Sequence, residues 1–250
     1  CKNCQNWEIS QANPEDSVAA KMPPDRIPAL AKEYDCLSVA YTYTDPVAYY
    51  EYTLDACAKT REAGLRNILV TAGYMNDPTA RELYKLADAA NIDLKAFSDR
   101  FYREVCDATL APVLNTLVVA KSMGVEVEVT NLLIPTLNDS DADIKALSRW
   151  VKENMGRETP LHFSRFSPRY RMKHIPPTPP ETLIRARGIA RAEGMYHVYI
   201  GNVLVPDAGK TFCHGCGALL VERVGYRILQ NRLSNGACPD CRTKAYGVWK

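Results

Sequence analysis

The 250-residue chain is expected to fold as an α/β domain on a parallel sheet, with a small cysteine-rich unit at its end. From residue 36 onward, short runs of β-branched and aromatic residues alternate with amphipathic helical segments. Repeated strand–helix units of this kind produce parallel sheets, either open or closed into a barrel. The composition changes after residue 202, and four cysteines follow in two close pairs. The ligands of such sheets gather at the carboxyl ends of the strands.

Six segments have the composition of buried strands, and five helical segments lie between them. The expected strands are 36–42, 67–72, 92–96, 125–133, 161–166 and 197–203. The expected helices are 46–63, 78–90, 109–123, 140–154 and 180–193. Cys57 falls on the apolar stripe of the first helix, so we expect it in the core.

Residues at the helix ends support these boundaries. Asp45 and Asp77 each precede a proline, which favours a capping acceptor followed by proline at the first helical position. Ser140 and Thr178 each lie three residues before an acidic residue, the spacing of a capping box. Glycines stand where three of the helices should end: Gly64, Gly124 and Gly194.

Composition argues against several functional classes. The net charge is +2 and the isoelectric point is near 8.1, so we expect no nucleic-acid partner. No apolar run approaches the roughly 18–20 residues of a membrane span, and no signal peptide is visible. With 46% hydrophobic residues and a mean hydropathy of −0.26, the chain can bury a full core.

Nine cysteines are present, and their spacing is typical of metal sites rather than of a disulfide framework. Six of them form three C-x2-C pairs: Cys1 with Cys4, Cys213 with Cys216, and Cys238 with Cys241. Thiols spaced in this way favour a reducing, cytoplasmic location. A mature lipoprotein would also begin with cysteine, but a second cysteine three residues later disfavours that interpretation.

The last two pairs predict a zinc ribbon over residues 206–250. Twenty-one residues separate Cys216 from Cys238, and four thiolates at such spacing form a tetrahedral structural zinc site. Rubredoxin-like iron and an auxiliary iron–sulfur cluster remain alternatives. So small a unit lacks a core of its own and would fold largely on binding its metal.

Taken alone, the first pair is compatible with several kinds of site, because zinc knuckles, redox pairs and iron–sulfur sites all use C-x2-C. The run Cys1-Lys2-Asn3-Cys4-Gln5-Asn6-Trp7 resembles the second and third cysteines of the C-x3-C-x2-C loop of radical S-adenosylmethionine (SAM) enzymes. It is most similar to the branch of glycyl-radical (pyruvate formate-lyase) activating enzymes, specifically the AmmeMemoRadiSam-system radical SAM enzymes. The first cysteine of that pattern would lie four residues before Cys1, which implies an N-terminally truncated chain.

This resemblance implies a radical SAM barrel, a partial (β/α)6 TIM-type barrel lacking its first strand, over residues 1–205. Cys1 and Cys4 would hold a [4Fe–4S] cluster that binds SAM and cleaves it reductively to a 5′-deoxyadenosyl radical. The radical would abstract hydrogen from an unknown protein or small-molecule substrate, with electrons from a reductant such as flavodoxin or ferredoxin. Without the first cysteine, we expect this chain to bind the cluster poorly.

The chain departs from the family at Asn3, where an aromatic or large apolar residue usually packs against adenine. The segment from Tyr41 to Pro46 resembles the family's Tyr-Thr-x-x-(Glu/Asp)-Pro. The resemblance implies that Asp45 accepts a hydrogen bond from the ammonium group of SAM, and it makes Thr44 a further cofactor-binding candidate. A helix N-cap at Asp45 is the alternative, and both roles are compatible.

Two residues near the end of the expected strand 67–72 are further cofactor candidates. Thr71 and Gly73 stand at its carboxyl end, where Gly73 would allow close approach of a ligand. An ordinary strand–helix turn explains the glycine equally well.

The motif Asp93-Leu94-Lys95 matches the Asp-x-Lys of activating enzymes. Alternation about Leu94 places both charged side chains on one face of an apolar strand, where charges are costly unless they are paired or bind a ligand. The resemblance makes Asp93 and Lys95 the catalytic candidates, in contact with SAM or with the substrate.

Later strands supply the remaining candidates. Glu126, Glu128 and Thr130 alternate with aliphatic residues, so they should share the inward face of the strand. The resemblance implies that Glu128 or Thr130 faces the SAM ribose or carboxylate. By resemblance, His162 would lie beside the adenine or ribose, although an isolated strand histidine is often a core residue.

Two alternatives to a radical SAM enzyme remain. One is a non-catalytic barrel whose zinc ribbon binds a partner. The other is a zinc-dependent TIM-barrel hydrolase, which would need several histidines at strand ends where only His162 qualifies. Iron and sulfide content would separate these readings.

Overall fold

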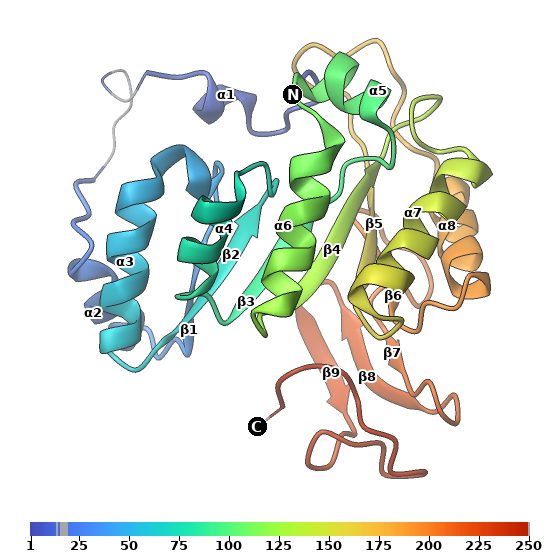
Figure 1. The fold of residues 1–250 in the computed structure, drawn as a ribbon. Helices are drawn as coiled ribbons and strands as arrows, with labels where there is room; N and C mark the ends of the chain where they lie inside the picture. The colour runs from blue at the N-terminus through green and yellow to red at the C-terminus, as the bar shows by residue number, and fades with distance from the viewer. Residues whose placement is uncertain (14, 16–19, 250) are drawn as a thin grey trace. The chain divides into compact units, whose positions relative to one another are not determined.

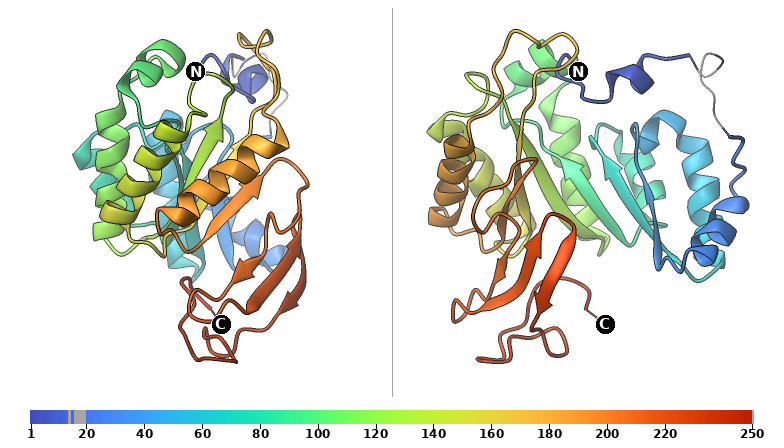
Figure 2. Two further views of the ribbon diagram at one scale, coloured as in Figure 1. Left: turned by 90° about the vertical axis from the view of Figure 1, so that its right-hand side faces the viewer. Right: turned by 180° about the vertical axis from the view of Figure 1, so that it is seen from behind.

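A computed structural model describes residues 1–13, 15 and 20–249 (Figures 1 and 2). The chain divides into two compact units, each discontinuous in sequence. Unit 1 comprises Cys1–Leu94, Tyr102–Val127 and Arg169–Lys173, and unit 2 comprises Lys95–Phe101, Glu128–Pro168 and His174–Lys250. Within the described part of the chain, no helix has the length and apolar character needed to span a bilayer.

Unit 1 contains three neighbouring parallel strands with helices packed on them. The strands are β1 (Ser38–Tyr41), β2 (Arg66–Thr71) and β3 (Ala89–Asp93). The longer helices are α2 (Arg26–Glu33), α3 (Tyr50–Glu62), α4 (Asp77–Tyr84) and α6 (Leu110–Ser122). Short helical pieces are α1 (Trp7–Ser10), the 3-10 turn η2 (Pro46–Tyr49) and the π-helical turn η3 (Tyr102–Cys106). Figures 1 and 2 show α3, α4 and α6 on one face of these strands.

Unit 2 contains a second set of parallel strands and a separate antiparallel sheet. The first two residues of β4 (Glu126–Leu133) belong to unit 1 and the others to unit 2, where β5 (Leu161–Arg165) and β6 (Val198–Gly201) follow. Its helices are α5 (Asp99–Phe101), α7 (Asp141–Met155) and α8 (Pro180–Ala192). The antiparallel strands are β7 (Thr211–Phe212), β8 (Leu219–Val224) and β9 (Arg227–Asn231). The chain thus has the predicted α/β fold, with six parallel strands in sequence order.

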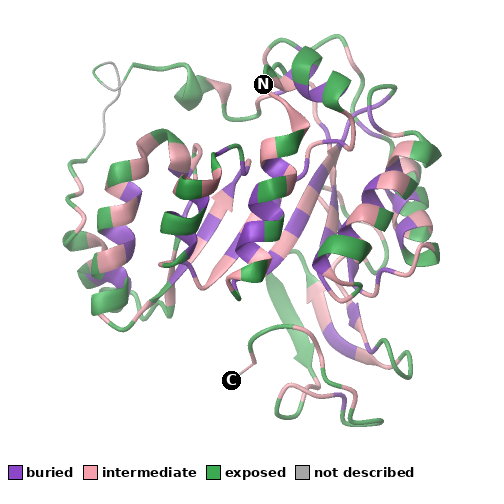
Figure 3. Ribbon diagram, viewed as in Figure 1, coloured by how far each residue is buried: buried purple, intermediate pink, exposed green. Residues whose placement is uncertain are grey.

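Burial alternates along the strands as the sequence pattern predicts (Figure 3). In β2, Asn67, Leu69 and Thr71 are buried, and Asn67 joins three segments of unit 1. Its Nδ2 donates to the carbonyls of Cys57 and Leu86, both at 2.9 Å, and its Oδ1 accepts from the Tyr41 hydroxyl at 3.2 Å. Cys57 is fully buried, as its place on the apolar stripe predicts.

Most predicted boundaries agree with the structure, but two elements of unit 1 differ. The predicted helix 78–90 ends at Tyr84, and the predicted strand 92–96 lies three residues earlier, at Ala89–Asp93. Ala89 and Ala90 are strand residues that pair with Ile68 and Leu69 of β2. Pairing within the sheet therefore overrides the helical propensity of alanine. The helix α2 was not predicted.

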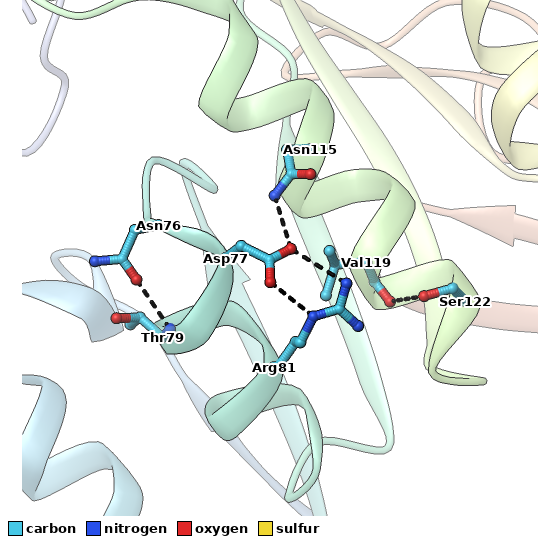
Figure 4. Close-up of polar contacts among 7 residues, drawn as sticks. All are labelled: Asn76, Asp77, Thr79, Arg81, Asn115, Val119 and Ser122. Carbon is cyan, nitrogen blue, oxygen red and sulfur yellow. Dashed lines mark hydrogen bonds and ion pairs between the residues drawn. The ribbon is translucent and has the colours of Figure 1, made fainter.

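Two predicted caps are also wrong. Asn76, not Asp77, caps α4 by accepting from the backbone N–H of Thr79 at 3.0 Å. Asp77 instead pairs with the Arg81 Nε at 2.7 Å and accepts from Asn115 (Figure 4). The hydrogen bond from Arg81 lowers the pKa of Asp77.

The cap predicted at Thr178 is the second error, because the N-cap of α8 is Pro179. The Thr178 hydroxyl accepts from the backbone N–H of Phe166 at 3.1 Å and donates to the carbonyl of Leu133. It therefore ties the chain before α8 to the last residue of β4 and to the residue that follows β5. The predicted caps at Asp45 and Ser140, in contrast, are both present.

A buried histidine makes unit 2 sensitive to acid. His197 is 5% exposed and its Nε2 has no partner among the described residues; burial, with His214 nearby, lowers its pKa from 6.5 to about 4. The unfolded chain binds a proton below pH 6.5 while the folded chain does not, so stability falls as pH drops from 6.5 to 4, by about 3 kcal/mol in total. Urea unfolding across this range should show that loss, and His197→Phe should remove it, whereas His174→Gln, at an exposed position, should not. Equal pH profiles for all three proteins would contradict this assignment.

Candidate functional site

The N-terminal cysteines lie in a loop that two distant segments of unit 1 hold in place. The Lys2 N–H donates to the carbonyl of Val105 at 2.7 Å, and the Lys2 carbonyl accepts from the Arg171 N–H at 3.2 Å. Trp7 stacks on Tyr170, with ring centroids 5.6 Å apart. The Cys1 thiol is exposed and the Cys4 thiol is partly exposed, so both can reach a metal. Across the described residues, these two thiols belong to no preassembled group of three metal ligands.

Asn3 carries the clearest sign that this loop receives a ligand. Its side chain is 4% exposed, and its Oδ1 has no hydrogen-bond donor within the described part of the chain. A buried amide oxygen left without a donor costs about 1–3 kcal/mol, which a ligand N–H would recover. The exocyclic amine of an adenine is such a donor. Asn3 is thus buried like the apolar residue it replaces, but it adds a hydrogen-bond acceptor, which fits the SAM that the sequence predicts here.

The end of β2 and the turn before η2 form one hydrogen-bonded network around Asp45. Its Oδ1 accepts from the Val47 N–H at 3.1 Å and from the Thr71 hydroxyl at 2.8 Å. Its Oδ2 accepts from the Ala72 N–H at 2.7 Å, while the Gly73 N–H donates to Thr71 Oγ1 at 3.0 Å. A carboxylate offers about four acceptor positions, so one stays open on Oδ2. The structure therefore brings Asp45, Thr71 and Gly73 together, while the neighbouring Thr44 side chain takes no part in this network.

Position 73 needs a glycine because of its backbone conformation and the side chain that packs against it. Its φ is +67°, and a Cβ added there would lie 2.8 Å from Cγ2 of Ile92. Gly73→Ala should lower the free energy of unfolding by about 2–4 kcal/mol, because it combines backbone strain with a steric clash. Gly64→Ala is the matched control, since Gly64 has φ +79° and open space around it. It should cost only about 1–2 kcal/mol in urea unfolding, and equal losses would show that the contact with Ile92 is unimportant.

In unit 2, the side chains of Glu128 and His162 form a hydrogen bond. His162 Nε2 lies 2.9 Å from Glu128 Oε2, and the imidazole stacks on Tyr199 with centroids 5.1 Å apart. The His162 side chain is 26% exposed, so it is not an enclosed core histidine. Both residues line a cavity of about 780 Å³ that extends to Arg223 of β8 and to Tyr226 in the turn between β8 and β9. Thr130 is half-buried on the same alternation of β4 but does not line this cavity.

The Asp-x-Lys motif shows the predicted alternation. Leu94 is fully buried, whereas Asp93 and Lys95 are both partly exposed. Asp93 ends β3 in unit 1, and Lys95 begins unit 2. The two charged residues of the motif therefore belong to different units.

Two buried asparagines that the sequence reading missed fix the backbone at Lys95. Its carbonyl accepts from the side-chain amides of Asn131 at 3.0 Å and of Asn138 at 2.7 Å. The Asn138 Oδ1 also accepts from the Ile134 N–H at 2.7 Å. Asn131 falls on the buried alternation of β4, so a polar residue at an apolar position was the available signal. Both side chains act as structural braces at the end of β4.

The four cysteines of the tail do form a preassembled group. Their four sulfur atoms all lie within 4.8 Å of one another. Cys213 Sγ is 3.5 Å from Cys241 Sγ, and Cys216 Sγ is 3.7 Å from Cys238 Sγ. A tetrahedral ion with metal–sulfur bonds near 2.3 Å places its thiolates about 3.8 Å apart, so the group is of the right size.

Local contacts prepare this group for a metal. Hydrogen bonding by Thr243 lowers the pKa of the Cys241 thiol to about 6, which favours a thiolate there, whereas hydrogen bonds with the neighbouring thiols raise the pKa of Cys216. The Gly215 N–H donates to Cys213 Sγ at 3.4 Å. His214 is not a member of the group and stacks on Tyr196, with centroids 4.3 Å apart.

Comparison with protein sequences identifies relatives of this chain. Residues 1–151, more than half of its length, match the Radical SAM superfamily. Over 98% of its length it is 44% identical to an uncharacterized protein of Methanocaldococcus jannaschii, MJ0808, of which it covers 73%. Over 102 residues it is 26% identical to the pyruvate formate-lyase-activating enzyme of Clostridium pasteurianum, covering 41% of this chain and 42% of that enzyme.

Solved structures share the fold at low sequence identity. A domain of the pyruvate-formate lyase-activating enzyme from Bacteroides vulgatus superposes with a TM-score of 0.58 at 16% identity, covering 66% of this chain and 99% of that domain. SuiB of Streptococcus suis, bound to its precursor peptide SuiA, gives a TM-score of 0.59 at 15% identity, covering 74% of this chain and 43% of SuiB. Together with the sequence match across residues 1–151, these findings show that the chain belongs to the Radical SAM superfamily.

Proposed function

We propose that this chain is the core of a radical SAM enzyme of the activating-enzyme type. The observation that carries the proposal is the buried Oδ1 of Asn3, which has no donor in the described ranges of the chain. It lies one residue before an accessible thiol, in a loop that matches the superfamily. In such enzymes a [4Fe–4S] cluster supplies the electron that cleaves SAM to the 5′-deoxyadenosyl radical. Cys1 and Cys4 would hold the cluster, and Asn3 would accept the hydrogen bond of the adenine amine.

The other candidate residues would bind and orient SAM or substrate. Asp45 would use its open acceptor position for the SAM ammonium group, with Thr44, Thr71 and Gly73 shaping the turn around it. Glu128, Thr130 and His162 would contact the ribose, carboxylate or adenine, and Asp93 and Lys95 would lie at the reacting atoms. The substrate would be a protein or a small molecule, and the reductant a flavodoxin or ferredoxin.

We further propose that residues 1–205 form the partial barrel and residues 206–250 a zinc ribbon. The sulfur–sulfur distances of the Cys213, Cys216, Cys238 and Cys241 group support a tetrahedral thiolate site. All nine cysteines are free thiols, which suits the reducing cytoplasm.

Formation of 5′-deoxyadenosine tests the proposal directly. The full-length gene product would be reconstituted anaerobically with iron and sulfide and supplied with SAM and dithionite. Chromatography and mass spectrometry should detect 5′-deoxyadenosine. A folded protein that binds zinc, takes up four irons and yet forms no 5′-deoxyadenosine would overturn the proposal and favour a non-catalytic barrel with an interaction module.

Substitutions can separate the role of Asp45 as a helix cap from its proposed role in binding SAM. Asp45→Asn removes the charge, so the Kd for SAM should rise at least about tenfold, the loss of one charge-assisted hydrogen bond. Asn76→Ala is the control, because it removes the cap of α4 and lowers stability by about 1 kcal/mol without touching the carboxylate. Equilibrium dialysis with reconstituted protein measures both Kd values. Equal Kd values for the two variants would reduce Asp45 to a helix cap.

A further inference from the structure

The cavity of unit 2 reaches beyond the residues that the proposed function uses. Its volume of about 780 Å³ is in the range of small-molecule sites. Glu128 and His162 form the part that is proposed above to face SAM. The remaining lining residues come from β6, from the segment that follows it and from the β8–β9 hairpin. We call the part lined by Leu204, Arg223 and Tyr226 the arginine wall, and its chemistry indicates a second ligand.

Hydrogen bonds fix the guanidinium of Arg223 at this cavity. Its Nη1 donates to the carbonyl of Gly209 at 3.1 Å and to the Thr211 hydroxyl at 3.0 Å. Gly209 itself lines the cavity, and Thr211 Oγ1 lies 2.9 Å from the hydroxyl of Tyr199, another lining residue. The opposite edge of the guanidinium, formed by Nε and Nη2, has no acceptor among the residues that the structure describes. Arg223 is therefore held in place with two donors to spare.

The same edge binds a carboxylate at other arginines of this protein. Arg81 donates to Asp77 through Nε at 2.7 Å and through Nη2 at 3.2 Å. Arg149 binds Glu193 through the same two atoms at the same distances. Both of these arginines are exposed, whereas Arg223 is half-buried and forms no ion pair within the described ranges. Because a partly desolvated charge without a counterion is costly, the free edge of Arg223 favours a ligand carboxylate.

The other lining residues suit an apolar body attached to that carboxylate. Leu204 is 84% exposed and Tyr226 is fully exposed, so a ligand that covers them removes apolar surface from water. Glu128, the acidic residue that lines the cavity, bonds to His162 at 2.9 Å and forms no ion pair with Arg223. The arginine wall therefore combines one available cation with exposed apolar side chains.

We propose that Arg223 binds the carboxylate of a small organic acid whose apolar body packs on Leu204 and Tyr226. The inference rests on the proposed function in one respect, since it makes this acid the substrate of the enzyme. Of the two substrate classes left open above, it selects the small molecule. Two charge-assisted hydrogen bonds should make the acid bind at least about tenfold more tightly than a neutral molecule of the same shape.

The test compares 3-phenylpropionate with its neutral amide, 3-phenylpropanamide, on the full-length protein without cluster or SAM. Titration calorimetry should give the acid a Kd at least about tenfold below that of the amide. Arg223→Gln should raise the Kd of the acid at least about tenfold and leave that of the amide within about twofold. Arg227→Gln is the matched control, because Arg227 is an exposed arginine of β9 that does not line the cavity. Equal Kd values of acid and amide, or no binding of either, would overturn the proposal.

A second variant tests the site even if Arg223→Gln fails to fold. Leu204→Glu changes an exposed position and places a negative charge at the cavity, so the Kd of the acid should rise about threefold while that of the amide stays constant. An unchanged Kd of the acid would put its site elsewhere. Tighter binding of 2-phenylethyl phosphate than of the acid would overturn the carboxylate as the ligand class. If the reconstituted protein forms no 5′-deoxyadenosine, the proposed function fails, while the Kd values still decide whether Arg223 binds an acid.

Discussion

Replacing Cys4 by alanine is expected to abolish the iron–sulfur cluster and to lower 5′-deoxyadenosine formation by about three orders of magnitude or more. The cluster requires anionic sulfur ligands, and the loop has no further thiol to replace the lost one. The Cys4 side chain is only partly buried, and its Sγ is 3.5 Å from the Ser10 hydroxyl. Stability should therefore change by less than about 0.5 kcal/mol. Iron analysis, visible absorbance and product formation measure the first two effects, and urea unfolding measures the third.

The matched control is Cys36→Ala. Cys36 is also exposed, and its thiol donates to the carbonyl of Tyr34 at 3.7 Å. That variant should keep wild-type iron content and rate. A Cys4→Ala protein that still holds four irons, or that matches Cys36→Ala in rate, would contradict the ligand assignment.

Local patterns predicted the elements of this fold well, but they could not identify tertiary partners. The sequence Asn76-Asp77-Pro78 offers two acceptors for one helix start. Asp77 is unavailable because Arg81 and Asn115 bind it, and Asn115 lies on another helix. Thr178 has the spacing of a capping box, but Leu133 and Phe166 compete successfully for its hydroxyl. Which residue caps a helix therefore depends on contacts with residues far away in the chain.

The candidate site shows the same limit. Motifs located the cysteine loop, Asp45 and the tail cysteines, and the predicted alternation around Leu94 is present. The sequence presented Asn3 only as a departure from an apolar pattern. Its burial, and an amide oxygen that has no donor among the described residues, become visible only in three dimensions. The asparagine brace at Lys95 required the same information.

Replacing Cys238 by serine is expected to release the metal of the tail and to unfold residues 206–250. In the described part of this segment, the buried apolar cluster comprises Cys213, Leu220, Val221 and Cys238, with a few partly buried side chains packed against it, and two of the four are proposed ligands. Structural zinc contributes about 10–16 kcal/mol of apparent folding free energy in comparable small units, far more than this core can supply. Colorimetric zinc analysis should fall from one equivalent to none. Amides of β8 and β9 should lose their protection from hydrogen exchange, while those of β1–β3 keep theirs.

Two variants separate metal binding from general damage. His214→Ala should keep its zinc, because His214 stacks on Tyr196 and lies outside the sulfur group. Cys57→Ser alters a fully buried thiol of unit 1, so it should lower overall stability but leave the zinc in place. Retention of one zinc and of the β8–β9 protection in Cys238→Ser would mean that the tail folds without its thiolates. Iron in place of zinc in the wild-type protein would keep the site but change its metal, since both ions accept four thiolates.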